Sequence, residues 1–208
     1  MGDGLVRFTV HDLLCDIGLG VDYAVRHPDR CIVREAVVAV AACHDGKAGY
    51  YGPFLYCDSD AEIAVGREMF GWPQVAAEMW LTPPDPFDGI KAGDVLAAKV
   101  SRLGRPVFEL EIAVERAGDF PEDVPAFATF YTMRVLPDPT GGPTVREVYA
   151  SEMSSVDVRA PWTGAGMLRV HAPELVNLQP KEAIAARANA IAWTKSVSTL
   201  LARTKVGP

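Results

Sequence analysis

The stretch that decides the fold of this chain is Ile63-Ala-Val-Gly-Arg-Glu-Met-Phe-Gly-Trp-Pro-Gln-Val75. It joins a Gly-Arg-Glu triplet to a Gly-Trp-Pro triplet, and it ends on an amide, Gln74, followed by the aliphatic Val75. An amide side chain donates and accepts hydrogen bonds but does not titrate, so Gln74 cannot serve as a nucleophile. The sequence on both sides predicts short strands, which place this stretch between elements of a β structure.

Strand-like segments separated by Gly- and Pro-rich turns fill most of the chain beyond residue 30. Pro106–Glu115 shows the pattern clearly, because apolar and polar residues alternate along it as a half-buried strand requires. It is predicted to form a hairpin with Asp94–Ser101. Many short strands of this kind indicate a mainly β fold, an antiparallel β-barrel or cone that is closed or nearly closed. The other predicted strands are Leu5–Val10, Cys31–Ala42, Tyr50–Cys57, Ala76–Leu81, Phe130–Leu136, Thr144–Ala150 and a pair that brackets Ala160–Gly166.

The C-terminal segment has a different pattern. From Pro180 to Lys205 it is rich in Ala and has no further Gly or Pro. Ile184, Ile191 and Leu201 are among the residues that fall on one stripe at helical spacing. We therefore predict a C-terminal helix that lies against the barrel. Because we find no repeat, linker or low-complexity segment, we also predict a single domain over residues 1–208.

Composition limits the possible functions. The 208 residues are 49% hydrophobic and carry a net charge of −7, which argues against a nucleic-acid or anionic membrane partner. No apolar run approaches the ~20 residues of a membrane span, and the first residues do not resemble a signal peptide, so we expect a cytoplasmic protein. The cysteines have no zinc-ligand spacing, so we expect free thiols, no metal and no other cofactor. They are Cys15, Cys31, Cys43 and Cys57.

Four motifs, in the same order, resemble the acetoacetate decarboxylase family. In that family the active-site segment reads Gly-Arg-Glu, a few variable residues, an aromatic residue and Pro-Lys-Lys, which is similar to Ile63–Val75. The resemblance covers roughly residues 31 to 200. It implies a β cone or barrel that encloses a pocket, and a homo-oligomer. The other motifs are Gly49–Asp58, Tyr131–Asp138 with Val145–Val148, and Ala160–Val170 with Leu178–Glu182.

The resemblance also implies that the chemistry has changed. The first family lysine forms a Schiff base with the β-keto acid, and Gln74 stands in its place, while Val75 replaces the second lysine. Glu35 matches a family active-site glutamate and can act as a general acid or base. Gln74 can polarise a carbonyl or hold an enol, but it cannot form an iminium. The substrate-binding residues implied are Phe54, Leu55, Arg67, Trp72 and Val75.

Several of these residues have structural alternatives. Glu35 could pair with an arginine such as Arg34, and Arg67 could hold the loop together instead of binding a ligand. Lys99 is the one lysine in an apolar setting that could replace the Schiff-base lysine, or it could reach solvent at a barrel rim. A second family glutamate matches the position of Thr9, and we find no partner for the family's N-terminal arginine.

These residues predict an enzyme that has left Schiff-base chemistry. We expect a cyclase, lyase or isomerase of secondary-metabolite biosynthesis that acts on a hydrophobic, carbonyl-containing, polyketide-like compound by orientation and acid/base catalysis. One alternative is a non-catalytic binding protein for a hydrophobic carbonyl compound. Another is a β-keto acid decarboxylase that uses a different lysine.

Overall fold

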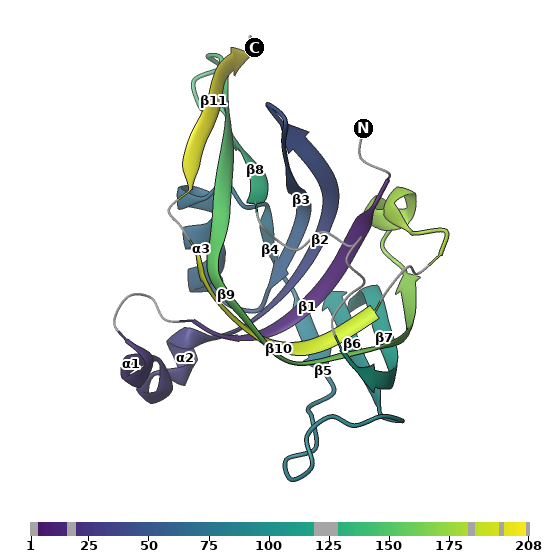
Figure 1. Cartoon of the computed structure of the whole chain (residues 1–208). Coiled ribbons are helices and arrows are strands. Elements are labelled where there is room, and N and C mark those ends of the chain that lie inside the picture. Colours follow the sequence, from purple (N-terminus) through teal and green to yellow (C-terminus); the bar gives the residue numbers. More distant parts are fainter. Residues whose placement is uncertain (1–3, 16–19, 119–128, 183–185, 196–197, 207–208) are drawn as a thin grey trace. The chain divides into compact units, whose positions relative to one another are not determined.

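A computed structural model describes residues 4–15, 20–118, 129–182, 186–195 and 198–206. The chain is mainly β, as predicted. It divides into two compact units, and the long strand β9 (Thr144–Val170) passes from one into the other (Figure 1). The prediction of a single domain stays a prediction. Unit 1 comprises Met1–Ala76, Phe127–Ser154 and Lys195–Pro208, and unit 2 comprises Ala77–Ala126 and Ser155–Thr194.

Unit 1 is built on the hairpin of β2 (Ile32–His44) and β3 (Lys47–Cys57). The turn residues Asp45 and Gly46 have φ of 48° and 80°, which an Asp-Gly pair adopts readily in a two-residue hairpin. The hairpin therefore joins the predicted strands Cys31–Ala42 and Tyr50–Cys57. Further strands extend the sheet in the order β1-β2-β3-β8-β9-β11, with β4 beside β3. Their bounds are β1 Val6–Leu14, β4 Gln74–Ala76, β8 Thr129–Leu136 and β11 Thr199–Val206.

Helix α3 (Asp60–Met69) connects β3 to β4. β4 runs parallel to β3, and parallel neighbours need a crossover connection of this kind. The hydroxyl of Ser59 accepts a hydrogen bond from the backbone N–H of Glu62 at 3.3 Å. Ser followed three residues later by Glu is a helix-start signature. We did not expect this helix from the apolar pattern.

A buried carboxylate ties β8, β9 and β11 together. Glu147 is 1% exposed, and it accepts hydrogen bonds from Arg134 Nε at 2.7 Å, Tyr149 Oη at 2.9 Å and Arg203 Nε at 2.7 Å. Burial alone would raise the pKa of Glu147, but the hydrogen bonds from these donors lower it below its ordinary value. The carboxylate therefore stays charged and holds three strands at once.

Unit 2 is an antiparallel arrangement in the order β9-β7-β6-β5, with β10 beside β9. The β6–β7 hairpin turns at Leu103 and Gly104, as predicted. Along β7, Phe108, Ile112 and Val114 are buried, which confirms the half-buried strand expected from the alternating pattern. The strands are β5 Glu78–Leu81, β6 Val95–Arg102, β7 Arg105–Ala117 and β10 Ala186–Lys195.

The predicted C-terminal helix is wrong, because the segment forms strands β10 and β11. Ala recurs at every second position from Ala186 to Ala192, which also fits a strand with one small-residue face. A Cβ at Gly166 of β9 would lie 2.5 Å from the Cβ of Ala186, so small residues on both sides let the strands approach closely. Pairing with β9 overrides the helix propensity of alanine.

Two further expectations need correction. One continuous strand, β9, replaces the pair predicted to bracket Ala160–Gly166. The second expectation is a barrel or cone that is closed or nearly closed. Among the described strands the path of paired strands ends at β1 and at β5, so these strands do not form a closed barrel.

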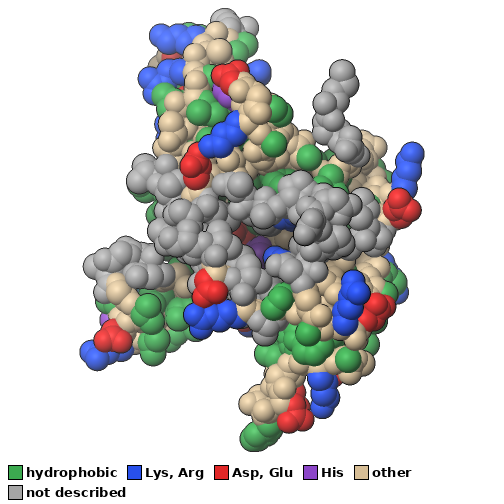
Figure 2. All heavy atoms as spheres, in the orientation of Figure 1, with side chains coloured by type: hydrophobic (Ala, Val, Ile, Leu, Met, Phe, Trp, Pro, Cys, Tyr) green, Lys and Arg blue, Asp and Glu red, His purple; other side chains and the backbone are tan. Residues whose placement is uncertain are grey.

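The remaining elements are short helices. They are α1 (Val21–Arg26), α2 (Pro28–Cys31) and the 3₁₀ helix η1 (Pro173–Leu178). Figure 2 shows hydrophobic side chains at the surface over α1, where Val21 and Val25 are exposed. In the part of the chain that the structure describes, none of the helices has both the length and the apolar character that crossing a membrane requires.

Replacing Glu147 by Gln tests the buried network. The variant leaves Arg134 and Arg203 without their carboxylate, and we expect the free energy of unfolding at neutral pH to fall by about 3–5 kcal/mol. Because the pKa of folded Glu147 is lowered, its stabilisation is complete above the ordinary pKa of 4.5 and is lost as the pH falls through the lowered value. Urea unfolding of the wild type and the variant, measured from neutral pH into acid, should therefore show a difference in the free energy of unfolding that becomes smaller as the pH falls.

The exposed Glu115 provides a matched control. Glu115→Gln should change the free energy of unfolding by less than about 0.5 kcal/mol. The role of Glu147 would be contradicted if both variants lost the same free energy of unfolding. It would also be contradicted if the difference between Glu147→Gln and the wild type were the same in acid as at neutral pH.

Candidate functional site

Glu35 and Gln74 meet across strand β3. Cys57 of β3 pairs with Glu35 of β2, and Leu55 of β3 pairs with Gln74 of β4. The two backbones are therefore two strand spacings apart, about 10 Å, which only long side chains can bridge. Gln74 Nε2 donates a hydrogen bond to Glu35 Oε1 at 2.8 Å. The structure thus brings together the two residues predicted to be catalytic.

Gln74 is held from the other side by α3. It is fully buried, and a Cβ at Gly66 would lie 1.8 Å from Gln74 Oε1, so any larger residue there would have to displace the amide. Among the described residues, Gln74 Oε1 has no hydrogen-bond partner. A buried polar atom without a partner costs roughly 1–3 kcal/mol. The unsatisfied amide oxygen is therefore a feature of Gln74 that packing alone does not explain.

Strand β8 anchors the loop between α3 and β4. Thr132 Oγ1 donates to the carbonyl of Phe70 at 2.7 Å, and Arg134 Nη1 donates to the carbonyl of Glu68. These contacts satisfy carbonyls at the end of α3 that have no partner within the helix. Gly71 has φ of 67°, and a Cβ there would lie 2.8 Å from the Cβ of Arg134. The loop that leads to Gln74 therefore has little freedom to shift.

An apolar cluster adjoins the polar pair. Val37, Ala39, Tyr50, Leu55 and Phe130 pack together, and Trp72 packs against them. Val37 lies two residues from Glu35 on the same face of β2. The predicted binding residues Leu55 and Trp72 therefore belong to an apolar surface beside Glu35.

The other predicted binding residues lie differently. Phe54 and Val75 are the chain neighbours of Leu55 and Gln74, and consecutive strand residues point to opposite faces. Their side chains are therefore directed away from the face that carries Glu35. Arg67 is exposed, and its Nη1 donates to the backbone carbonyl of Gln74 at 3.2 Å, a contact that suits its alternative role of holding the loop. Substrate binding by these three residues stays a prediction.

Strand β1 adds His11 and Arg7, which we did not predict for the site, on either side of Thr9, which matches the position of a second family glutamate. His11 is the cross-strand partner of Glu35, and Thr9 and Arg7 precede it at alternate positions on the same face. Arg7 Nη2 donates to Tyr50 Oη at 3.0 Å. Burial lowers the pKa of His11 to about 4. Polar residues at every second position of β1 were a sequence signal that could have identified these side chains. The register of β1 against β2, which places His11 beside Glu35, could not be predicted from the sequence.

Cys57 lies beside the pair but is not activated. Burial raises the pKa of its thiol to about 12, and the nearby charge of Glu35 adds to the effect, while a backbone hydrogen bond at Ser59 opposes it. A neutral thiol is a poor nucleophile at neutral pH. Across the residues that the structure describes, no group of three or more His, Cys, Asp or Glu side chains is placed to hold a metal ion.

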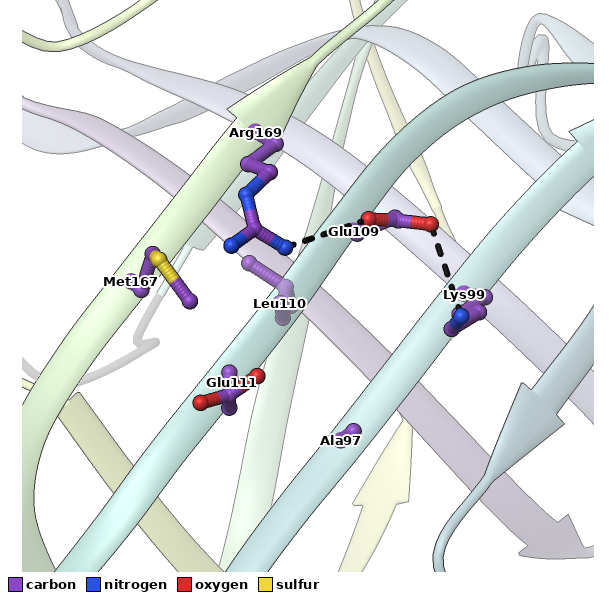
Figure 3. A pocket seen from close by; sticks show the side chains of 7 residues that line it. All are labelled: Ala97, Lys99, Glu109, Leu110, Glu111, Met167 and Arg169. Carbon is purple, nitrogen blue, oxygen red and sulfur yellow. Dashed lines mark ion pairs between the residues drawn. The ribbon is translucent and has the colours of Figure 1, made fainter.

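Unit 2 carries a separate small pocket around Glu109 (Figure 3). Lys99 Nζ and Arg169 Nη1 each lie 3.6 Å from a carboxylate oxygen of Glu109. The pocket holds about 70 Å³, far below the roughly 300–1,000 Å³ of ligand sites. The side chain of Lys99 is 64% exposed, so it reaches solvent, as its structural alternative predicts.

Comparison with known proteins identifies relatives that match most of the chain. A family model described as acetoacetate decarboxylase matches residues 18–203. The acetoacetate decarboxylase of Clostridium botulinum (strain Eklund 17B / Type B) is 24% identical over 169 residues, which cover 81% of this chain. The chain spans 61% of the length of that relative.

Solved structures share the fold. An acetoacetate decarboxylase-like enzyme from Sphingomonas wittichii RW1 superposes with a TM-score of 0.69 at 22% identity, covering 86% of this chain and 72% of that chain. The enduracididine biosynthesis enzyme MppR, solved with pyruvate, gives a TM-score of 0.72 at 19% identity, covering 96% of this chain and 75% of that chain. The predicted fold type is therefore confirmed, apart from the corrections made above.

Replacing Gly66 by Ala tests the contact that positions Gln74. The new Cβ would displace the amide and strain its bond with Glu35, and we expect the free energy of unfolding to fall by about 1–3 kcal/mol. This loss would occur although Ala is favoured over Gly in a helix by about 1 kcal/mol. Urea unfolding measures the difference.

The same substitution in a Gln74→Ala background is the control. Without the amide the clash is absent, and Gly66→Ala should then stabilise by up to about 1 kcal/mol. An equal loss in both backgrounds would show that Gly66 is required for another reason.

Proposed function

Because the chain belongs to the acetoacetate decarboxylase family, we propose that it is an enzyme that uses the family fold without a Schiff-base lysine. Its substrate is a hydrophobic, carbonyl-containing compound of polyketide-like type, and its reaction is a cyclisation, elimination or isomerisation. One observation carries this proposal: at the position that resembles the family lysine, the amide of Gln74 is bonded to Glu35 at 2.8 Å.

The chemistry follows from these two groups. Glu35 removes a proton from the carbon next to the substrate carbonyl, and the C–H electron pair forms the C=C bond of an enolate. The amide N–H of Gln74 donates to the oxygen on which the negative charge develops. Glu35 then returns the proton at another position or to a leaving group. General acid–base catalysis of this kind contributes about 10²–10⁴-fold to a rate.

Two further observations support a carbonyl substrate. MppR was solved with pyruvate and with the condensation product of pyruvate and imidazole 4-carboxaldehyde, which are small carbonyl compounds. In this chain, Trp72 and the apolar cluster around Leu55 lie beside Glu35. An apolar surface with a few convergent polar groups is the usual composition of a small-molecule site.

Two alternatives remain as outcomes of the tests. The bond between Glu35 and Gln74 is complete without a substrate, which is the observation that favours a binding protein. A decarboxylase that uses another lysine would need an amine near Glu35, and the lysine side chains that the structure describes are exposed. They are Lys47, Lys91, Lys99, Lys181 and Lys205.

Borohydride trapping tests the absence of Schiff-base chemistry. Incubation with acetoacetate or pyruvate and then borohydride should leave the mass of the intact protein unchanged, because Gln74 cannot form an iminium. The Clostridium botulinum acetoacetate decarboxylase, treated in parallel, is the positive control. A reduced adduct mapped to any lysine of this chain would overturn the proposal in favour of the decarboxylase alternative.

Glu35→Gln tests the acid/base role. With pyruvate in deuterium oxide, the wild type should exchange the methyl protons for deuterium, and the variant should do so about 100-fold more slowly. Proton NMR follows the exchange. Intrinsic tryptophan fluorescence, to which Trp72 contributes, follows the binding of pyruvate, and the affinity for pyruvate should change little between the two proteins. Glu115→Gln should behave as the wild type. Binding without exchange in the wild type would instead identify a binding protein.

A further inference from the structure

His11 is placed against the candidate site by the register of β1 and β2. It is the direct cross-strand partner of Glu35, and such partners have Cβ atoms roughly 4.5–5.5 Å apart on the same face of the sheet. Glu35 in turn is bonded to Gln74. His11 of β1 and Gln74 of β4 therefore lie on either side of Glu35 of β2, on the same face of the sheet.

The protonation state of His11 decides what it can do. The side chain is half-buried, and burial lowers its pKa to about 4. The imidazole is therefore neutral at neutral pH, with one nitrogen that donates and one that accepts. A neutral imidazole N–H can polarise a carbonyl without adding a charge to the site.

We infer that His11 is a further catalytic residue, whose ring N–H binds the carbonyl oxygen of the substrate while Glu35 removes the neighbouring proton. The inference rests on the enolising reaction proposed above and adds a second donor to the amide of Gln74. The C–H bond breaks, its electron pair forms the C=C bond, Glu35 holds the proton, and the oxygen receives hydrogen bonds from His11 and Gln74. Two donors directed at one oxygen form the kind of arrangement that stabilises an enolate.

The arrangement also indicates the substrate class. The described groups on this face near Glu35 include the neutral ring of His11, the neutral amide of Gln74, the thiol of Cys57, the hydroxyl of Thr9 and apolar residues of the cluster around Leu55. Neutral donors suit the oxygen of a ketone or aldehyde within an apolar molecule. Arg7 lies further along β1, where it donates to Tyr50.

The experiment compares variants of His11 in the deuterium exchange of pyruvate. His11→Phe keeps a ring but removes the donor, and kcat for exchange should fall about 100-fold with KM nearly unchanged. His11→Gln restores a donor N–H and should recover at least tenfold of that loss. His44→Phe, at the last residue of β2, should exchange as the wild type. Urea unfolding checks that each variant is folded.

A second measurement is independent of turnover. In protein with isotope-labelled histidine, pyruvate should shift the ring nitrogen resonances of His11 and leave those of His44 and His171 in place. Wild-type exchange in His11→Phe, or ring resonances of His11 that do not respond to pyruvate, would overturn this inference. Wild-type exchange in Glu35→Gln would instead overturn the proposed function, so the two failures are distinguishable.

Discussion

Gln74 occupies a space that is closed on opposite sides, by the backbone of α3 at Gly66 and by the carboxylate of Glu35. Its strand reaches this place because β4 runs parallel to β3, which in turn requires the crossover helix. A lysine here would form a buried ion pair with Glu35, whose desolvation cost can exceed its attraction. An amide has no nucleophilic amine. It replaces that ion pair with a hydrogen bond in which only one partner is charged. In the proposed function, an amide at this one position therefore changes both the chemistry and the energetics of the site.

The site also depends on a network that is remote from its chemistry. Arg134 donates both to the carbonyl of Glu68, at the end of α3, and to the buried carboxylate of Glu147. Glu147 is held by Arg203 of β11 as well. The loop that carries Trp72 is therefore connected through one arginine to three strands of unit 1. A rigid support of this kind is what acid/base catalysis by orientation needs, because small displacements of the catalytic groups cost large factors in rate.

Local signals predicted much of the fold, and non-local pairing explains the errors. The hairpins at Asp45-Gly46 and Leu103-Gly104 were predictable because turn residues and alternation lie within a few positions of each other. The capping signature Ser59–Glu62 is equally local, and it indicates a helix start that the apolar pattern does not. The C-terminal strands could not be predicted from propensity, because alanine favours a helix until pairing with β9 decides otherwise. For the candidate site, Glu35 and Gln74 are predicted by resemblance, whereas His11 depends on a register that a shift of one residue would reverse.

The distinction between Leu55 and Phe54 shows how register shapes the site. Val38 pairs with Phe54 and Val40 pairs with Tyr51, so β3 has one more residue than β2 in this interval. The extra residue falls at Gly52-Pro53, and proline, which cannot donate to the ladder, is tolerated at such a bulge. The bulge reverses the alternation, so that Tyr50 and Leu55 share one face although five positions separate them. Without it Phe54, and not Leu55, would adjoin Gln74, and the carboxylate of Glu35 would have a different apolar neighbour.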